Sequence, residues 1–153
     1  MYEQLKLENQ LCFPFYAASR LIIRAYQKDL DALGITYPQY LVLMVLWEKD
    51  YLSVIEIGEK LVLNTNTITP LLKRMEQQGL ITRSPSSKDQ RKTMIALSEK
   101  GKAMQKEATQ IPNNLLKRLH IDKDEEKIEE LKRLKSQIKE LIELLKAEGQ
   151  VQP

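Results

Sequence analysis

The chain has 153 residues with 24 Lys or Arg and 21 Asp or Glu, for a net charge of +3, and this length suits one domain with a hydrophobic core of its own. Aromatic residues, glycine and proline are sparse, so the fold class is predicted to be mainly α. One cysteine excludes a disulfide within the chain, and one histidine argues against a zinc site built by a single copy. No apolar run reaches the roughly 18 residues that span a bilayer, and the first residues lack the apolar stretch of a signal peptide, so we expect a cytoplasmic protein without a metal or cofactor.

The first predicted element is a long helix over residues 5–33, whose apolar residues recur at three- and four-residue steps. Proline is tolerated only in the first turn of a helix, so Pro14 predicts that the regular helix starts near Phe13 or bends there. Either geometry puts Cys12 at or beside a helix N-terminus. Gly34 is expected to end the helix.

Two shorter helices are predicted next. Thr36 or Tyr37 can cap the first, and its apolar stretch 41–47 has no polar face, which is typical of a buried helix. The run Ser53-Val54-Ile55-Glu56 is a capping box, so the second short helix starts there.

An amphipathic helix follows over residues 64–78. Its apolar residues lie at i, i+3, i+4 and i+7, which makes one apolar stripe. Asn64 or Thr65 can cap its start, and Gly79 can end it in a left-handed turn. The stripe consists of Ile68, Leu71, Leu72 and Met75, and the opposite face carries Asn66, Thr67, Thr69, Pro70, Lys73 and Arg74.

A strand, a polar turn and a second strand are predicted over residues 80–83, 84–90 and 91–97. A capped helix followed by a β-hairpin is the layout of a winged helix-turn-helix with a small β-wing. Six basic and two acidic residues give 64–95 a net charge of +4, so the rest of the chain carries −1. A DNA-facing surface is expected to concentrate positive charge in this way, and an ordinary solvated surface is the alternative.

The C-terminal part is predicted to be helical. Ser98 begins a helix that Pro112 bends or interrupts before Leu119, and a capping box at 122–125 opens the last helix. The apolar spacing of the last helix is typical of a coiled coil, which requires a helical partner from this chain or from a second copy. Its stripe consists of Leu131, Leu134, Ile138, Leu141 and Leu145.

Long helices at both ends of a central DNA-binding module favour a homodimer built from the termini, because a symmetric operator needs two copies. Residues 1–153 are therefore predicted to form one domain. The winged helix-turn-helix lobe spans 36–97, and a helical dimerisation region spans 5–33 and 98–148.

These segments resemble the MarR family of bacterial transcriptional regulators. The resemblance covers roughly residues 7–119 and rests on the recognition block 67–76 with Gly79-Leu80-Ile81, the wing run Asp89-Gln90-Arg91 and the run 97–101. More narrowly, the chain resembles the organic-hydroperoxide-sensing repressors of that family. The narrower resemblance is carried by the runs 7–13, 16–20, 35–43 and 111–112, together with Tyr26.

Three features depart from the pattern of that branch. Asn66 stands at the start of the recognition helix where glycine is common, and Pro14 stands where an ordinary residue is usual. Members with a two-cysteine mechanism carry a second cysteine late in the chain, which this sequence lacks, so the chain resembles the one-cysteine kind.

The resemblance implies that the helix 64–78 enters the major groove of DNA while the wing reaches the adjoining minor groove. Side chains in the first turns can reach base edges, and the cations further along are better placed for phosphates. Arg91 is expected to enter a narrow A·T-rich minor groove while Asp89 holds its guanidinium, and a weak surface ion pair is the alternative. Two-fold symmetry predicts an inverted repeat with half-sites about one helical turn apart. The predicted DNA contacts are Thr65, Asn66, Thr67, Thr69, Lys73, Arg74, Lys88, Asp89 and Arg91.

Cys12 has two interpretations. A lone cysteine among apolar residues is most often a small buried hydrophobe, whereas a thiol at a helix N-terminus is favoured as the reactive thiolate. The resemblance adds Tyr26 and Tyr37, whose hydroxyls in this branch hydrogen-bond the reactive sulfur of the other subunit. It implies a repressor that holds its operator when Cys12 is reduced and leaves it when an organic hydroperoxide oxidises Cys12 to sulfenic acid. That species then forms a mixed disulfide with a low-molecular-weight thiol, cyclises with a backbone nitrogen, or overoxidises.

Three other functions remain open. A MarR-type regulator can respond to a small aromatic acid or another oxidant, with Cys12 incidental. A peroxide-consuming enzyme is disfavoured because the chain offers no second thiol for turnover and no evident metal or haem site. A helical dimerisation module without DNA function is disfavoured by the positive charge concentrated in 64–95.

Overall fold

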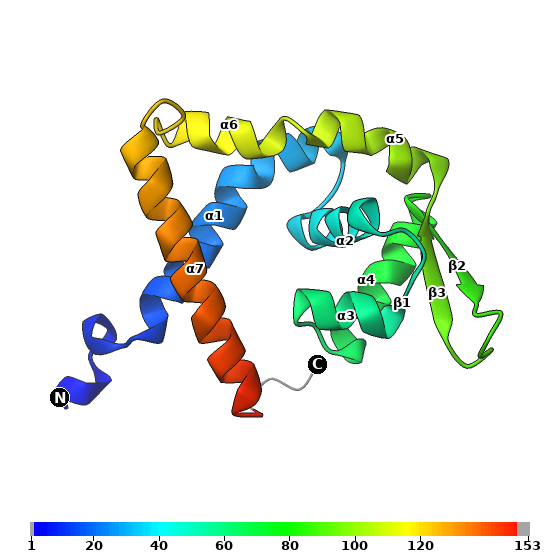
Figure 1. The fold of residues 1–153 in the computed structure, drawn as a ribbon, viewed down its shortest axis with the longest axis horizontal. Helices are drawn as coiled ribbons and strands as arrows, with labels where there is room; N and C mark the ends of the chain where they lie inside the picture. Colours follow the sequence, from blue (N-terminus) through cyan, green and yellow to red (C-terminus); the bar gives the residue numbers. More distant parts are fainter. Residues whose placement is uncertain (1, 150–153) are drawn as a thin grey trace. The chain divides into compact units, whose positions relative to one another are not determined.

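The computed structural model describes residues 2–149 and consists of two compact units, Met1–Tyr37 and Pro38–Pro153. Helices dominate and one small antiparallel sheet accompanies them, which confirms the mainly α class with a β-wing (Figure 1). No single described helix is long and apolar enough to cross a membrane, and α1 and α2 meet that criterion only when they are counted together as a broken pair. The helices are α1 (Cys12–Leu33), α2 (Tyr37–Glu48), α3 (Val54–Leu61), α4 (Thr65–Gln77), α5 (Glu99–Ala108), α6 (Ile111–Arg118) and α7 (Glu125–Ala147), with short 3-10 turns η1 (Glu3–Leu5) and η2 (Leu7–Asn9) and strands β1 (Leu52–Ser53), β2 (Ile81–Pro85) and β3 (Thr93–Leu97).

The first long helix begins later than residue 5. Two 3-10 turns precede α1, and the amide of Gln10 donates to the carbonyls of Gln4 and Lys6 at 2.6 and 3.0 Å, which stabilises these turns in place of a regular helix. The prediction of a helix over the whole of 5–33 is therefore wrong for its first residues, and the predicted start near Phe13 is correct to within one residue. Pro14 is the third residue of α1, where a missing N–H costs no hydrogen bond. 

The second helix, α2, is buried as its apolar sequence predicts. Six of its twelve residues are buried, and all but Gln39 and Tyr40 among them are aliphatic. The capping box that opens α3 is also present: the Glu56 carboxylate accepts from the Ser53 backbone N–H at 2.8 Å, and the Ser53 hydroxyl accepts from the Glu56 N–H at 3.2 Å. The local sequence therefore correctly predicts the two helices that precede α4.

Helix α4 buries its stripe and exposes its polar face. Asn64 is its N-cap, with Oδ1 accepting from the Thr67 N–H at 2.9 Å, and Gly79 ends it at a φ of 70°. Pro70 lies in the second turn, deeper than the helix start that the sequence argument required, and its missing N–H leaves the Asn66 carbonyl without its helical partner. The buried stripe consists of Ile68, Leu71, Leu72 and Met75, all 5% exposed or less.

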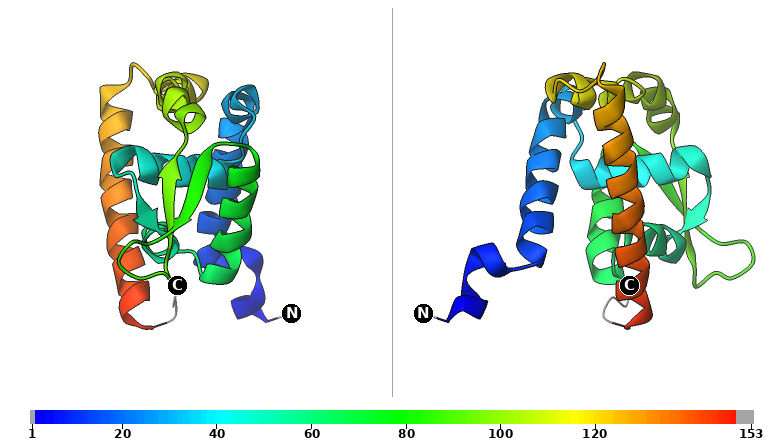
Figure 2. Two further views of the ribbon diagram at one scale, coloured as in Figure 1. Left: turned by 90° about the vertical axis from the view of Figure 1, so that its right-hand side faces the viewer. Right: turned by 60° about the vertical axis from the view of Figure 1, so that its left-hand side comes forward.

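The sheet has the order β1-β3-β2, with both pairs antiparallel. In the register, Ile81 pairs with Leu97 and Arg83 with Ile95, which keeps the apolar members on the core side. The strands differ from the predicted limits by one or two residues because Ser86 N–H donates to the Lys92 carbonyl at 2.8 Å and closes the turn nearer its tip. The β2–β3 turn projects beyond the helices of its unit in the right-hand view of Figure 2.

The C-terminal helices follow the prediction with one correction. The predicted helix to Leu119 is interrupted between α5 and α6, and Pro112 is one of the first two residues of α6. The cap of α7 is Asp124, whose Oδ1 accepts from the Lys127 N–H at 2.9 Å, and not Asp122 as the capping-box pattern predicted. Asp122 instead lies in a turn, because His120 has a left-handed φ of 56° and the Asp124 N–H donates to Ile121.

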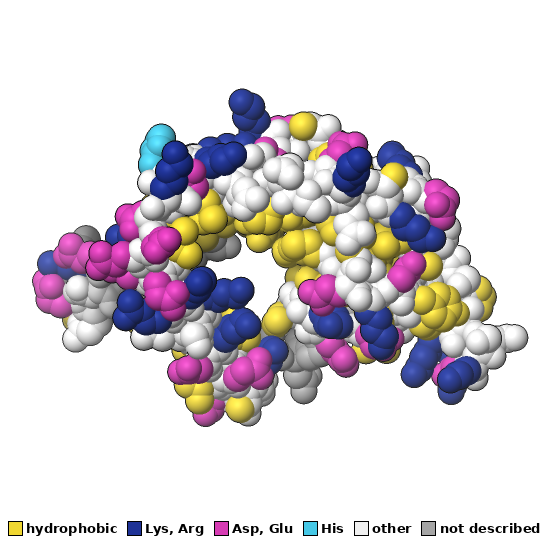
Figure 3. Space-filling model, turned by 45° about the horizontal axis from the view of Figure 1, so that its top comes forward, with side chains coloured by type: hydrophobic (Ala, Val, Ile, Leu, Met, Phe, Trp, Pro, Cys, Tyr) yellow, Lys and Arg dark blue, Asp and Glu magenta, His cyan; other side chains and the backbone are white. Residues whose placement is uncertain are grey.

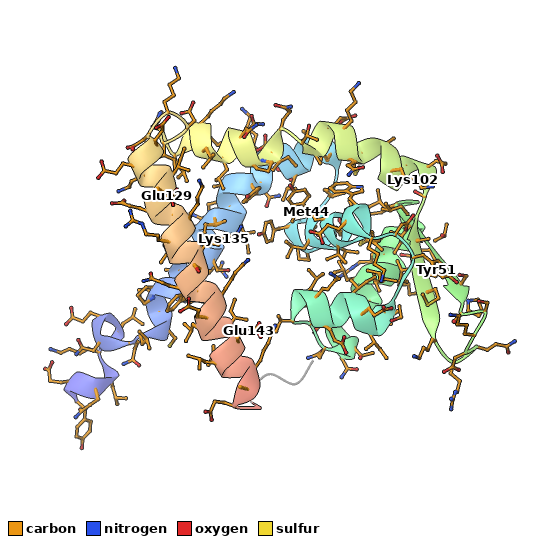
Figure 4. All side chains as sticks on the ribbon, viewed as in Figure 1. Met44, Tyr51, Lys102, Glu129, Lys135 and Glu143 are labelled. Carbon is orange, nitrogen blue, oxygen red and sulfur yellow. The ribbon has the colours of Figure 1, made fainter. Side chains whose placement is uncertain are left out.

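No residue of α7 within the described part of the chain is buried. On its apolar stripe, Leu131, Leu134 and Leu145 are 40, 48 and 43% exposed. The charged residues Glu129, Lys135 and Glu143 mark the length of the helix in Figure 4. Within the unit Pro38–Pro153, no described helix buries this stripe.

Candidate nucleic-acid interface and thiol site

Helix α4 presents the predicted DNA-contacting side chains on one face because its apolar stripe is turned inward. The hydroxyl of Thr67 donates to Asn64 Oδ1 at 2.9 Å, which holds this side chain at the start of the helix. Short polar groups occupy the first turns and the two cations follow them, so hydrogen-bonding groups and positive charge are arranged in that order along the helix. The exposed residues on this face are Thr65, Asn66, Thr67, Thr69, Lys73 and Arg74.

The wing holds Arg91 at its tip. Asp89 Oδ1 accepts from Arg91 Nε at 3.2 Å and from the Arg91 backbone N–H at 3.1 Å. The Arg91 side chain is 92% exposed, so its terminal nitrogens face outward while its Nε is held. Lys88 is exposed in the same turn, and basic side chains stand at the projecting tip on the right of Figure 3. The predicted contact between Asp89 and Arg91 is confirmed.

A hollow of about 230 Å³ lies between the starts of α3 and α4 and the wing. Arg83 and Lys92 line it although neither was among the predicted DNA contacts, and alternation along β2 could have indicated the side of the sheet on which Arg83 lies. Arg83 is anchored by Glu76 of α4, with Nη1 3.6 Å from Oε2, and its buried Nε has no hydrogen-bond partner. The hollow is lined by Ser53, Val54, Ile55, Thr65, Thr69, Arg83, Arg91, Lys92 and Thr93.

Cys12 is the first residue of α1 and is exposed, so the predicted position at a helix N-terminus is confirmed and the buried interpretation does not hold within one chain. Tyr26 lies fourteen residues further along the same helix, which is about 21 Å at 1.5 Å per residue. The ring of Tyr26 lies instead against that of Tyr37, with centroids 5.4 Å apart. The structure thus brings the two predicted tyrosines together but does not bring Cys12 of the same chain to them.

Both phenols keep their protons at neutral pH. Burial raises the pKa of Tyr26, and the neighbouring Tyr37 raises it further. Burial also raises the pKa of Tyr37. Each hydroxyl is therefore a hydrogen-bond donor that a thiolate can use. 

The helices α2, α3 and α4 with the β2–β3 hairpin define a winged helix-turn-helix. A model of the MarR family matches residues 35–93. The organic hydroperoxide resistance transcriptional regulator of Bacillus subtilis (strain 168) is 47% identical over 144 residues, which cover 94% of this chain and 95% of that protein. The chain therefore belongs to the MarR family, whose members found here are transcriptional regulators and not enzymes.

Solved structures of AbfR, a protein of Staphylococcus epidermidis, have the same fold. Reduced AbfR bound to DNA has a TM-score of 0.73 and 38% sequence identity, over 92% of this chain and 97% of that one. Disulfide-formed AbfR has a TM-score of 0.66 and 37% identity, over 94% of both chains.

Proposed function

We propose that this MarR-type regulator is a dimeric repressor that binds an inverted-repeat operator when Cys12 is reduced and leaves it when an organic hydroperoxide oxidises Cys12. The observation that carries the DNA-binding part is the exposed polar and cationic face of α4 beside a wing that holds Arg91 outward. The similarity to a protein crystallised on DNA supports the same assignment. We place the protein in the cytoplasm, where its operator is.

In the proposed complex, α4 enters the major groove and Arg91 enters the flanking minor groove of an A·T-rich half-site. Thr65, Asn66, Thr67 and Thr69 contact base edges, since they come first along the helix. Lys73, Arg74 and Lys88 contact phosphates, which position the protein without specifying sequence. Asp89 orients the Arg91 side chain through the contacts described above.

The proposed dimer is built from residues 5–33 and 98–148, with the lobe 36–97 free to meet DNA. Its support is the exposed apolar surface of both regions: Phe15 and Ile22 on α1 are 41 and 45% exposed, and three leucines of the α7 stripe are 40 to 48% exposed. Exposed apolar surface of this extent is typical of a protein–protein interface. Two copies then match the two half-sites of an inverted repeat.

The thiol site is proposed to form between subunits. Cys12 lies about 21 Å from its own Tyr26 along α1, so the two phenols that serve its sulfur come from the second copy. The thiolate attacks the distal oxygen of an organic hydroperoxide, the O–O bond breaks, and the alcohol leaves with a proton as Cys12 becomes sulfenic acid. With one cysteine in the chain, a low-molecular-weight thiol then supplies the sulfur of a mixed disulfide, unless the acid cyclises or overoxidises.

Release from DNA requires a minimum difference in free energy between the DNA-competent and the released state. Converting a population that is 99% DNA-competent into one that is 1% competent needs about 5.5 kcal/mol of differential stabilisation. Each of the two thiol sites loses two phenol hydrogen bonds, and each bond contributes about 1 kcal/mol. Together with repacking around an adduct, this loss is comparable to the free energy that release requires.

The test is a fluorescence-anisotropy titration of an A·T-rich inverted repeat, repeated after one equivalent of organic hydroperoxide and again after added thiol. We expect tight binding, release, and recovery in that order. The Cys12→Ser variant should bind the operator with normal affinity and keep it in the presence of peroxide. Release of that variant by peroxide would refute the thiol switch and leave the DNA-binding assignment intact.

The hollow beside α4 supports a second candidate signal, a small aromatic acid. Three cations, Arg83, Arg91 and Lys92, line a volume of about 230 Å³ together with the apolar side chains of Val54 and Ile55. That volume is below the roughly 300–1,000 Å³ of typical ligand pockets and suits a single ring with a carboxylate. A benzoate-type acid that releases Cys12→Ser from DNA would identify this signal, and no effect at millimolar concentration would exclude it.

A further inference from the structure

A side-chain hydrogen bond from a buried glutamine of α2 to an exposed glutamine joins α2 to the end of the recognition helix. Gln39 is the third residue of α2 and is 3% exposed. Its Nε2 donates to Oε1 of Gln78 at 2.7 Å, and Gln78 is the C-cap of α4. Because Tyr37 is the first residue of α2, the same helical turn carries a tyrosine of the thiol site and the donor of this bond.

Hydrogen bonds also join the end of α4 to the start of α5. Lys100 Nζ donates to the Gln78 carbonyl at 2.9 Å, and the Ser98 hydroxyl donates to the Gly79 carbonyl at 2.6 Å. A Cβ at Gly101 would clash with the carbonyl oxygen of Leu80, so the first turn of α5 lies directly against the backbone that follows α4. The segment around Gln78 is therefore a junction where α2, α4 and α5 meet.

We propose that Gln39 is a positioning residue that transmits the state of the thiol site from Tyr37 to the recognition helix through its hydrogen bond to Gln78. A buried helix in a close-packed lobe moves as a rigid element and not by local adjustment, so displacement of Tyr37 displaces Gln39 with it. Gln78 follows its donor, and the C-terminal end of α4 turns against its anchor on α5. This inference rests on the proposed function, because it names the step between the sulfur and the DNA.

The test compares two variants of similar side-chain length, one that keeps an oxygen acceptor and one that does not. Gln78→Glu keeps an oxygen where Gln39 donates, and Gln78→Met has the same chain length but no acceptor of comparable strength. For each full-length dimer, the operator dissociation constant is measured in the reduced state and after one equivalent of cumene hydroperoxide. The ratio of the two constants cancels any effect of the new charge on DNA binding itself.

We expect Gln78→Met to bind the operator within about threefold of the wild type when reduced, and its oxidised-to-reduced ratio to fall about tenfold. Gln78→Glu should keep the wild-type ratio, as should the matched control Gln77→Ala, which removes an exposed glutamine one position earlier. The rate at which peroxide consumes the Cys12 thiol should be the same in all variants, since the bond acts after the chemistry. Gln39→Leu, which removes the donor, should repeat the loss, with thermal unfolding as its folding check.

Three results would overturn the inference. One is a Gln78→Met ratio within twofold of the wild type. Another is an equal loss of operator affinity in the reduced and the oxidised state, which would mean that the hydrogen bond only stabilises α4. A wild-type ratio of one would refute the proposed function itself, and the inference with it.

Discussion

The winged-helix lobe and the two terminal helices α1 and α7 carry equally clear apolar patterns but satisfy them differently. In the lobe, α2 buries six residues and α4 buries its complete stripe. Among the described residues of α1 only Leu30 is buried, and α7 buries none. The same periodicity therefore predicts that a face will be covered but does not say by which chain.

The two regions therefore have different roles, one in monomer stability and the other in assembly. The lobe closes its core within one chain, so its stability belongs to the monomer. The open faces of α1 and α7 bear on assembly instead, since burying a leucine there stabilises a complex by about 1.5–3 kcal/mol. The predictions below separate these two roles.

The largest expected effect is on the lobe core. Leu43 is fully buried in α2, and Leu43→Ala should lower the free energy of unfolding by about 2–5 kcal/mol through the cavity it leaves. Denaturant unfolding should give the same loss at low and high protein concentration. The control Ile55→Ala, at a position 56% exposed on α3 of the same lobe, should change little. A concentration-dependent loss at Leu43 would show that the lobe is not closed within one chain.

The second largest effect is expected on formation of the dimer. Leu134→Arg puts a charge on the stripe of α7, and we expect dissociation in sedimentation with about a 100-fold loss of operator affinity, because a monomer meets only one half-site. Glu143→Arg introduces the same side chain on the opposite side of the helix and should leave the dimer intact. A dimer that survives Leu134→Arg would remove α7 from the proposed interface.

A smaller effect is expected at the wing. Arg91→Ala should weaken operator binding about tenfold, and the slope of log K against log salt should fall by about one because the minor groove loses one positive charge that displaces counterions from DNA. Lys106→Ala on α5 removes an exposed charge away from the wing and serves as the control. An unchanged slope for Arg91→Ala would mean that the wing does not meet DNA.

The smallest effect concerns the cap of α3 and depends on pH. Hydrogen bonds from the Ser53 hydroxyl and backbone hold the pKa of Glu56 below its ordinary value of 4.5. A depressed carboxyl pKa stabilises the fold above the unfolded value and loses that contribution as pH falls through the folded value. Ser53→Ala should therefore cost about 1 kcal/mol at pH 7 and clearly less at pH 3, as measured by thermal unfolding. An equal cost at both pH values would contradict this account.

Much of the lobe could be predicted from the sequence because its signals are local. The cap at Asn64, the capping box at Ser53 and the stripe of α4 each depend on residues within about one or two helical turns of one another. The polar face of α4, the tip contact between Asp89 and Arg91, and Cys12 at a helix start followed from the same short-range rules. The choice of Asp122 as a cap was wrong, since two acidic residues in one short loop satisfy the same local pattern.

By itself, the sequence determined the long helices and the β2–β3 hairpin and which face of each is apolar, since period and capping are decided within a few residues, but it missed β1 and the 3-10 turns before α1. Only the tertiary structure decided which distant side chains meet. Gln39 and Gln78 are separated by 39 positions, and the hollow beside α4 is built from three separate segments, so no local pattern contains either. Their pairing follows from close packing of the whole lobe, which brings side chains from distant segments into contact.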